Sequence, residues 1–436
     1  MFKFISSVFP GLSAAFVRKS VIHSLILRSL GLVLIFCSQV LLARLMGVKG
    51  YGEYTVIITA LNFIVVFSLF GMDTSVLRFL PSYLQKKDYQ SAHGFVRFSY
   101  RMISFLAVIG SIGIFIYLLS HSKKYHIGFS EAIFWSMLIL PFLVFVNQAS
   151  SVLRALQKIK ASLLPAYFLF PVGMGIGWLY YYNAHEKLPV DAAMMINLIV
   201  TILVFIIIYK KVTRNVRILI PAAEPKPERK LWLMVSTTVL LTSFLNILLK
   251  QSDILFVSYF LGNAAAGKYA AAAKMAMIVT LGLSVIDYVY IPKIAAMWES
   301  KKLIGLQQMI REASKQILII TIPIVLVLII AGKWLLGLFG QSFSASYIPL
   351  LILVCGQLIN AMTGMVGGLL MMTGHQRKFL FFYFISFCFQ AGLNFVLIPK
   401  YGIVGASIAS ASAIVFLNGV AYLYVKRKLK ISAAAF

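Results

Sequence analysis

The sequence predicts an all-α polytopic membrane protein with about twelve transmembrane helices, in two parallel six-helix lobes around a central cavity. Three observations lead to this fold class. Hydrophobic residues make up 61% of the chain and charged residues only 12%, against roughly 25% charged in a soluble domain. The apolar residues gather into long runs. A phrase of the form G-x4-G-x-Y occurs at 47–54 and again at 262–269, 215 residues further on.

The apolar runs give the individual helices. A helix needs about 20 apolar residues to cross the hydrocarbon core of a bilayer. The runs that meet this requirement lie near 21–45, 53–73, 98–120, 130–150, 162–182, 190–209, 234–261, 268–290, 314–337, 345–372, 378–398 and 403–425.

The basic residues give the orientation. With the N-terminus inside, 29 of the 40 Lys and Arg residues fall on the cytoplasmic side, eight fall outside and three lie within spans. Positive charge concentrates on the cytoplasmic side of membrane proteins. We therefore expect a multi-pass protein of the bacterial cytoplasmic (inner) membrane with both termini in the cytoplasm. The net charge of +28 is explained by topology and membrane lipids, and no nucleic-acid partner is expected.

One linker divides the chain. The stretch 210–230 holds three prolines and seven basic residues and follows the sixth span. It predicts an N-terminal six-helix lobe over 1–209, a cytoplasmic linker over 210–230 and a C-terminal six-helix lobe over 231–436. Because six spans return the chain to the same side, the two lobes are expected to be parallel repeats.

The G-x4-G-x-Y phrase is expected to be an external turn between helices, where glycine allows a tight path. Its offset of 215 also sets a register between the lobes. Asp73 and Asp287 fall at matching places near span ends. Helix capping, or pairing with Arg78 or Lys293, is the expected role of these two carboxylates.

Three cations are expected at membrane depth. Only 15 uncharged residues separate Arg28 from Arg44, about 22 Å of helix, which is too short for the core unless the first span begins before Arg28. The register places Lys250 at the depth of Ile35 and Lys274 at that of Thr59. A charge at mid-bilayer costs roughly 2.5–3.5 kcal/mol on insertion scales, so these groups should face a water-filled cavity.

The structural alternatives for these residues stay open. Lys250 and Asp253 lie three residues apart on one helical face and could neutralise each other. Arg28 could reach the cytoplasmic interface with its long side chain. On the functional interpretation, Arg28, Lys250 and Lys274 bind an anionic substrate, since their groups suit phosphate oxygens. Asp253 is then the candidate for ion or proton coupling.

Catalysis is not expected. The sequence has no G-x4-G-K-[ST] phosphate loop, no histidine pair with zinc-helix spacing and no Ser/His/Asp or paired-carboxylate arrangement. No catalytic residue, metal ligand or cofactor is therefore proposed, and the chain is not expected to be an enzyme.

Several segments resemble the polysaccharide transporter (oligosaccharide flippase) family of the multidrug/oligosaccharidyl-lipid/polysaccharide flippase superfamily. They are LLARLMGVKGYGEY at 41–54, FGMDTSVLRFLP at 70–81, KQSD at 250–253, YFLG at 259–262 and IPKYGIVGAS at 398–407. The resemblance implies two six-helix lobes that open a central cavity alternately to each side. It also implies that a polyprenyl-pyrophosphate-linked oligosaccharide is the substrate.

The sequence therefore favours a flippase for a lipid-linked anionic oligosaccharide, acting as a monomer beside a glycan polymerase and glycosyltransferases. One rival is a cation-coupled multidrug or toxin antiporter of the same superfamily. It would need acidic cavity residues, and only Asp253 is expected well within the bilayer. The other rival is a membrane-embedded glycan polymerase or ligase. It would need a large external loop, and the expected external loops are short.

Overall fold

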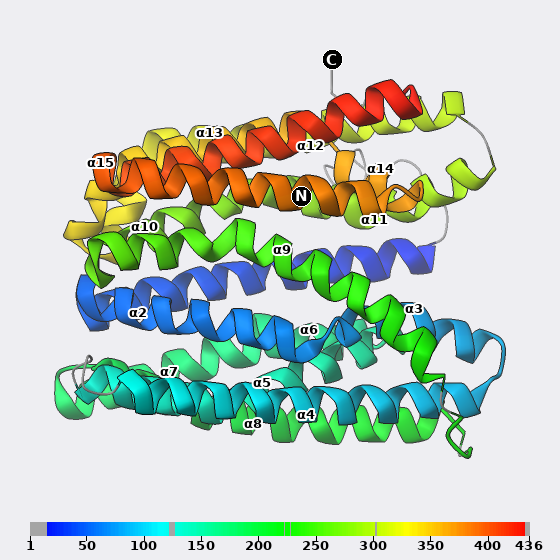
Figure 1. Cartoon of the computed structure of the whole chain (residues 1–436), viewed down its shortest axis with the longest axis horizontal. Helices are drawn as coiled ribbons and strands as arrows, with labels where there is room; N and C mark the ends of the chain where they lie inside the picture. Colours follow the sequence, from blue (N-terminus) through cyan, green and yellow to red (C-terminus); the bar gives the residue numbers. More distant parts are fainter. Residues whose placement is uncertain (1–14, 122–126, 222, 227, 301–302, 432–436) are drawn as a thin grey trace. The chain divides into compact units, whose positions relative to one another are not determined.

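The computed structural model describes residues 15–121, 127–221, 223–226, 228–300 and 303–431, and within these ranges the regular structure is entirely helical. The chain forms two compact units (Figure 1). We call Lys19–Phe244 the N unit and Leu245–Phe436 the C unit. The boundary lies inside one helix, α9 (Arg229–Leu261).

The N unit contains the helices that precede this boundary. They are α2 (Ala15–Leu69), α3 (Met72–Gln85), α4 (Tyr89–His121), α5 (Ile127–Ala155), α6 (Ile159–Leu164), the π-helix η2 (Pro165–Leu169), α7 (Phe170–His185) and α8 (Val190–Leu219). Helix α5 packs along both α8 and α4. In the core, the rings of Tyr54 and Trp178 meet edge to face with centroids 6.1 Å apart.

The C unit follows α9. Its elements are α10 (Asn263–Ala276), the 3-10 helix η3 (Met277–Thr280), α11 (Leu281–Glu299), α12 (Leu303–Phe339), the 3-10 helix η4 (Gln341–Ser346), α13 (Tyr347–Met362), α14 (Val366–Met372), α15 (Gln376–Tyr424) and the π-helix η5 (Val425–Leu429). Its core is a cluster of apolar side chains from α11 to α15, with Ile294, Ile310 and Ile317 fully buried.

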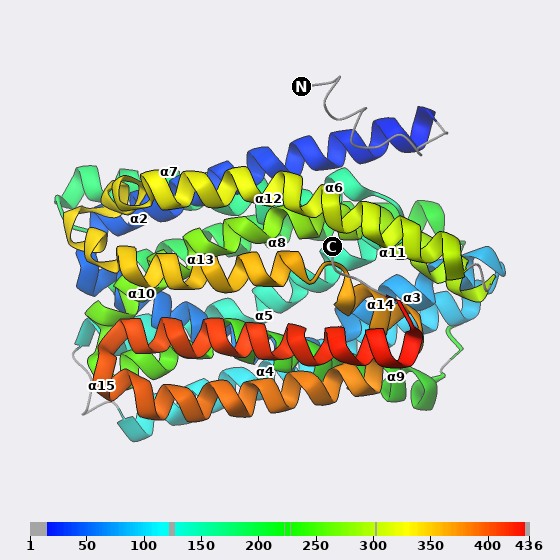
Figure 2. The ribbon, with the colours of Figure 1, turned by 90° about the horizontal axis from the view of Figure 1, so that it is seen from above.

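Nine helical segments of the described residues are long and apolar enough to cross a membrane. Two of them, Leu30–Gln85 and Gln376–Leu429, exceed 50 residues. Each contains a break in its helical backbone, at Gly47 in α2 and at Gly402 in α15. At these breaks the chain reverses direction (Figures 1 and 2). The polytopic all-α class is confirmed, and the number of about twelve spans remains a prediction.

The two copies of the G-x4-G-x-Y phrase share a backbone conformation. Gly47 has φ 69° and ψ −179°, and Gly262 has φ 81° and ψ 172°. This region is essentially restricted to glycine, which explains glycine at the start of both phrases. The residues after each glycine are helical. The expected turn is therefore a single-residue reversal followed directly by a helix, because the short polar residues in the phrase do not prevent helix formation.

The expected linker is shorter in the structure than its composition indicates. Helix α8 continues to Leu219 and α9 begins at Arg229. Basic residues such as Lys210 and Arg214 extend α8, and the irregular connection is confined to 220–228.

Candidate functional site

A buried carboxylate lies at the centre of the most polar region of the C unit. Asp253 on α9 is 3% exposed. Its Oδ2 accepts hydrogen bonds from the Tyr269 hydroxyl at 2.7 Å and from the Ser410 hydroxyl. Its Oδ1 accepts from Gln390 Nε2 and from Asn394 Nδ2, the latter at 3.2 Å. Helices α9, α10 and both arms of α15 therefore converge on one side chain.

These contacts explain how an acidic residue is accommodated in an apolar helix. Burying a carboxylate without hydrogen bonds is very costly, whereas four donors satisfy most of its lone pairs. The donors are also tied to one another. Gln390 Nε2 lies 3.1 Å from the carbonyl oxygen of Leu249 and 3.2 Å from Ser410 Oγ. Such a connected network fixes the positions of its members.

The network contains two oxygen atoms without a hydrogen-bond donor. Gln390 Oε1 and Asn394 Oδ1 are both buried and accept no hydrogen bond. Amide and carboxylate oxygens are the ligands that hard cations prefer. The site therefore has the chemistry to hold a proton on Asp253 or a small cation among these oxygens.

A cavity of about 350 Å³ adjoins the network within the C unit. Asp253, Tyr269 and Ser410 form part of its wall. The other polar residues in the wall are Lys250, Thr280, Ser284, Asp287, Gln357, Asn360, Tyr383 and Asn418. This concentration of hydrogen-bonding groups within an apolar helical unit is what a hydrated cavity requires.

Lys250 lines this cavity, and its side chain is exposed. It lies eleven residues before the end of α9 at Leu261, about 16 Å along the helix axis. Within the described part of the chain, no ion pair joins Lys250 to Asp253, whose oxygens are occupied by neutral donors. The alternative in which these two residues neutralise each other by direct contact is therefore wrong.

Asp287 is a cavity residue that the sequence analysis placed wrongly. It was expected to cap a helix or to pair with Lys293. Instead it lies in the second turn of α11, lines the cavity, and has a buried Oδ1 without a hydrogen-bond partner. Lys293 lies with its Nζ 5.3 Å from the centre of the Tyr290 ring. The physical reason is the 3-10 helix η3, which starts a new helix whose end is at Glu299.

The other predicted site residues lie elsewhere. Lys274 is partly buried in the last turn of α10, and the residues that line the C-unit cavity do not include it. Arg28 is partly buried on α2 in the N unit. Asp73, the N-unit match of Asp287, lies in the first turn of α3, where a carboxylate interacts favourably with the helix dipole.

The N unit has a counterpart of the Tyr269 contact. Tyr54, 215 residues earlier, is 5% exposed, and its hydroxyl accepts a hydrogen bond of 2.8 Å from Asn197 Nδ2 on α8. At the position that matches Asp253 stands Ser38, which donates to the carbonyl oxygen of Ile35 in its own helix. The counterpart is therefore neutral.

The fold is that of the MATE transporters in the MOP superfamily. An inward-facing multidrug resistance MATE family transporter of that superfamily gives a TM-score of 0.73 at 15% identity, covering 92% of this chain and 94% of its own. The MATE multidrug transporter DinF-BH gives 0.67 at 16% identity, covering 94% and 95%. A MOP superfamily transporter from Pyrococcus furiosus, described as having a binding pocket of reversed polarity, gives 0.68 at 16% identity, covering 94% and 96%.

Within this class the chain belongs to the polysaccharide biosynthesis protein family, which it matches over residues 17–298, more than half its length. The resemblance seen in the sequence is thereby confirmed. A comparison with curated protein sequences gave no significant match. Family and fold are those of transporters and flippases.

Proposed function

We propose that the protein is a flippase that moves a polyprenyl-pyrophosphate-linked oligosaccharide across the bacterial cytoplasmic membrane by alternating access. The observation that carries this proposal is a polar cavity inside a helical unit of a polysaccharide biosynthesis family member. A glycan cannot cross hydrocarbon without hydrogen-bonding partners. The amides, hydroxyls and charged groups of the C-unit cavity can supply them.

Lys250 is the proposed contact for the pyrophosphate. Its ammonium group faces a cavity and is not paired with Asp253, so it can bind a phosphate oxygen without first breaking an ion pair. Arg28 and Lys274 are proposed as additional cations on the substrate's path. Termini in the cytoplasm, and a glycan polymerase and glycosyltransferases as partners, belong to the same proposal.

Asp253 is the proposed coupling residue. Its position on α9 is only three residues from Lys250, and its partners come from α10 and α15. A proton or cation that binds Asp253 would change the hydrogen bonds that tie these helices together. Such a differential contact is what a ligand needs to shift a conformational equilibrium.

The substrate is tested in proteoliposomes that contain the purified protein and a polyprenyl-pyrophosphate-linked oligosaccharide. The measurement is the rate at which the glycan becomes accessible to a membrane-impermeant reagent. Lys250→Gln should slow this rate about tenfold or more, the loss expected for one interaction with a phosphate. Lys333→Gln, which removes an exposed lysine from α12, should leave the rate unchanged. Equal rates for both variants would refute the role of Lys250.

The coupling role is tested by Asp253→Asn in the same assay. An imposed sodium or proton gradient should accelerate flipping by the wild-type protein and should have no effect on the variant. Binding of the lipid-linked substrate should persist in the variant. A variant that still responds to both gradients would exclude Asp253 as the coupling residue.

A second candidate function is the cation-coupled multidrug antiporter. The specific observation in its favour is that two carboxylates, Asp253 and Asp287, line the C-unit cavity with one lysine. An organic cation would be attracted to such a site. Efflux of a fluorescent organic cation that stops in Asp287→Asn, with no movement of lipid-linked glycan by the wild-type protein, would decide for this function.

A further inference from the structure

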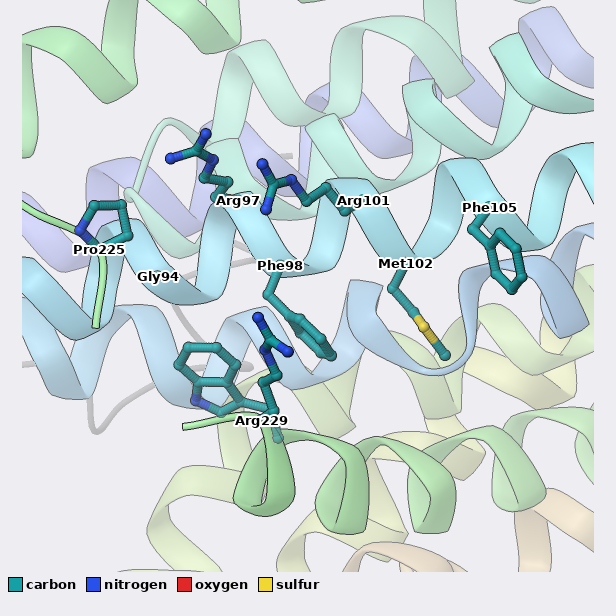
Figure 3. A pocket seen from close by; sticks show the side chains of 9 residues that line it. Gly94, Arg97, Phe98, Arg101, Met102, Phe105, Pro225 and Arg229 are labelled. Atoms are coloured by element: carbon teal, nitrogen blue, oxygen red, sulfur yellow. The ribbon is translucent and has the colours of Figure 1, made fainter. Parts of the chain in front are cut away.

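Three arginines surround a second cavity, which lies in the N unit (Figure 3). Its volume is about 410 Å³. Arg97 and Arg101 come from α4, and Arg229 is the first residue of α9. The rest of the wall is formed by Gly94, Phe98, Met102, Phe105, Pro225 and Trp232. No carboxylate is among these described wall residues, so the cavity is strongly cationic.

The irregular connection between α8 and α9 is fastened against α4 beside these arginines. The backbone N–H of Lys226 donates to the carbonyl oxygen of Gln90 at 3.1 Å. The Nε2 atom of His93 lies 3.0 Å from the carbonyl oxygen of Pro221. At Gly94 an added Cβ would lie 2.2 Å from the carbonyl oxygen of Lys226. Only glycine permits this approach, which holds Pro225 and Arg229 at the cavity.

The floor of the cavity is rigid and aromatic. Trp232 is fully buried, and its Nε1 donates to the Tyr83 hydroxyl at 2.9 Å. The Tyr83 hydroxyl in turn donates to Glu228 Oε2 at 2.7 Å. The nearest acidic group in the connection is therefore held by a tyrosine and does not enter the cavity wall. The Phe98 ring packs on Trp232 with centroids 5.5 Å apart.

The arginines continue into an apolar helix face. Arg97 and Arg101 are spaced by four residues, and the exposed apolar residues Phe105, Val108, Ile112 and Ile116 follow at helical spacing on the same face of α4. Between 52% and 63% of each of these four side chains is exposed. One face of α4 thus carries cations at one end and hydrocarbon-compatible surface along the rest.

We propose that this cavity binds the headgroup of an anionic phospholipid, whose acyl chains lie along the exposed face of α4. Guanidinium groups match the geometry of phosphate oxygens and can bind them with two hydrogen bonds. The apolar face selects a membrane lipid over a soluble phosphate, because only a lipid fills both parts of the site. The charge distribution predicts that this end of α4 is cytoplasmic, where anionic lipids attract basic residues.

The proposal does not depend on which substrate the protein transports. It assigns a structural lipid to the junction of α4, the connection and α9. A lipid bound there would bridge Arg97 and Arg101 to Arg229 and stabilise the start of α9.

The test measures the phospholipid retained by the purified protein, by native mass spectrometry after detergent extraction from membranes that contain phosphatidylglycerol and phosphatidylcholine. The double variant Arg97→Gln, Arg101→Gln should retain about tenfold less phosphatidylglycerol, because two charge-assisted contacts are lost. The control is Arg214→Gln, Arg217→Gln. It removes the same charge from exposed arginines near the end of α8 and should retain the wild-type amount. Equal retention by the two double variants would overturn the proposal.

Two further measurements identify the ligand class. Phe105→Asp changes one exposed side chain and should also lose the lipid, even if the double variant does not fold. Phosphatidylglycerol should raise the thermal midpoint of the wild-type protein, whereas glycerol 3-phosphate at the same concentration should not. A rise with glycerol 3-phosphate would indicate a soluble phosphate site. Displacement of phosphatidylglycerol by polyprenyl pyrophosphate at equal concentration would indicate a substrate site. Either result would refute the proposal.

Discussion

Tyr54 in the N unit and Tyr269 in the C unit occupy matching places, yet their hydroxyls do opposite things. Both side chains are buried, and both follow a glycine of the same unusual backbone conformation by seven residues. The Tyr54 hydroxyl accepts a hydrogen bond from Asn197, whereas the Tyr269 hydroxyl donates one to Asp253. The two units thus share a backbone frame, and only the C unit places a carboxylate within it.

The difference originates on the helix that precedes each glycine. Ser38 satisfies its hydroxyl within its own helix, while Asp253 depends on side chains from three other segments. A residue that is satisfied locally leaves its helix free to move. A residue with distant partners couples its helix to theirs. We therefore expect substitutions in the C unit to have the larger effects.

The comparison is broken most severely by removing the two hydroxyl or carboxyl groups. Asp253→Ala leaves several buried donors without an acceptor and should destabilise the protein by about 3–5 kcal/mol. Ser38→Ala loses one local hydrogen bond and should cost about 1 kcal/mol or less. The thermal midpoint in detergent measures both. Similar midpoints for the two variants would show that Asp253 does not hold its network together.

The two tyrosines offer a milder version of the same test. Tyr269→Phe removes a bond to a carboxylate and a contact of 3.0 Å with Ser410 Oγ, which should cost about 1.5–3 kcal/mol. Tyr54→Phe removes a neutral bond, for about 0.5–1.5 kcal/mol. In the flipping assay, only Tyr269→Phe should alter the response to an ion gradient. An altered response in Tyr54→Phe alone would reverse the assignment of the coupling unit.

The glycines sharpen the comparison because they should behave alike. Gly47→Ala and Gly262→Ala force a side chain into a left-handed backbone conformation, although an added Cβ would have open space in both places. Each should therefore lose about 1–2 kcal/mol from backbone strain alone. Thermal midpoints that fall by the same amount would support a common frame. A large fall in only one variant would argue against it.

Asp88 gives the opposite case, a carboxylate in water. It precedes α4 and accepts a hydrogen bond of 3.0 Å from the backbone N–H of Ser91, which lowers the pKa of Asp88 below its ordinary value of 3.8. A lowered pKa means that this stabilisation is present above pH 3.8 and is lost as the pH falls through the pKa of the folded state. Asp88→Ala should cost about 1 kcal/mol or less at pH 7.

The pH dependence is checked with Asp88→Asn, which keeps an N-cap side chain but cannot ionise. The difference in thermal midpoint between wild type and this variant should shrink when the pH is lowered from 7 to 3. A difference that grows on acidification would mean that the Ser91 contact does not favour the ionised form.

Composition and periodicity predicted the fold class, because a charge-poor chain of this length can only be solvated by lipid. The repeated phrase predicted the register that relates Gly47 to Gly262. Asp253 was singled out from its depth alone. Its partners were not, because Gln390 and Ser410 lie 137 and 157 residues away along the chain. No local pattern in a single sequence records such a contact.

Asp287 shows a different kind of failure. Hydropathy marked the end of an apolar run at about residue 290, and the carboxylate was therefore placed at a helix end. The helix continues to Glu299, and its start is shifted by the 3-10 turn of Met277–Thr280. Hydropathy reports where apolar residues stop, whereas backbone hydrogen bonds decide where a helix stops.

The distance in sequence between Asp253 and its partners has a consequence for synthesis in the cell. At roughly 5–20 residues per second, the ribosome reaches Gln390 about 7–27 s after Asp253. Throughout this interval α9 carries an acidic group whose later hydrogen-bond donors do not yet exist. The newly made C unit should therefore depend on the insertion machinery or on a chaperone for that period. Chains that stop before α15 should be the preferred substrates of membrane quality-control proteases.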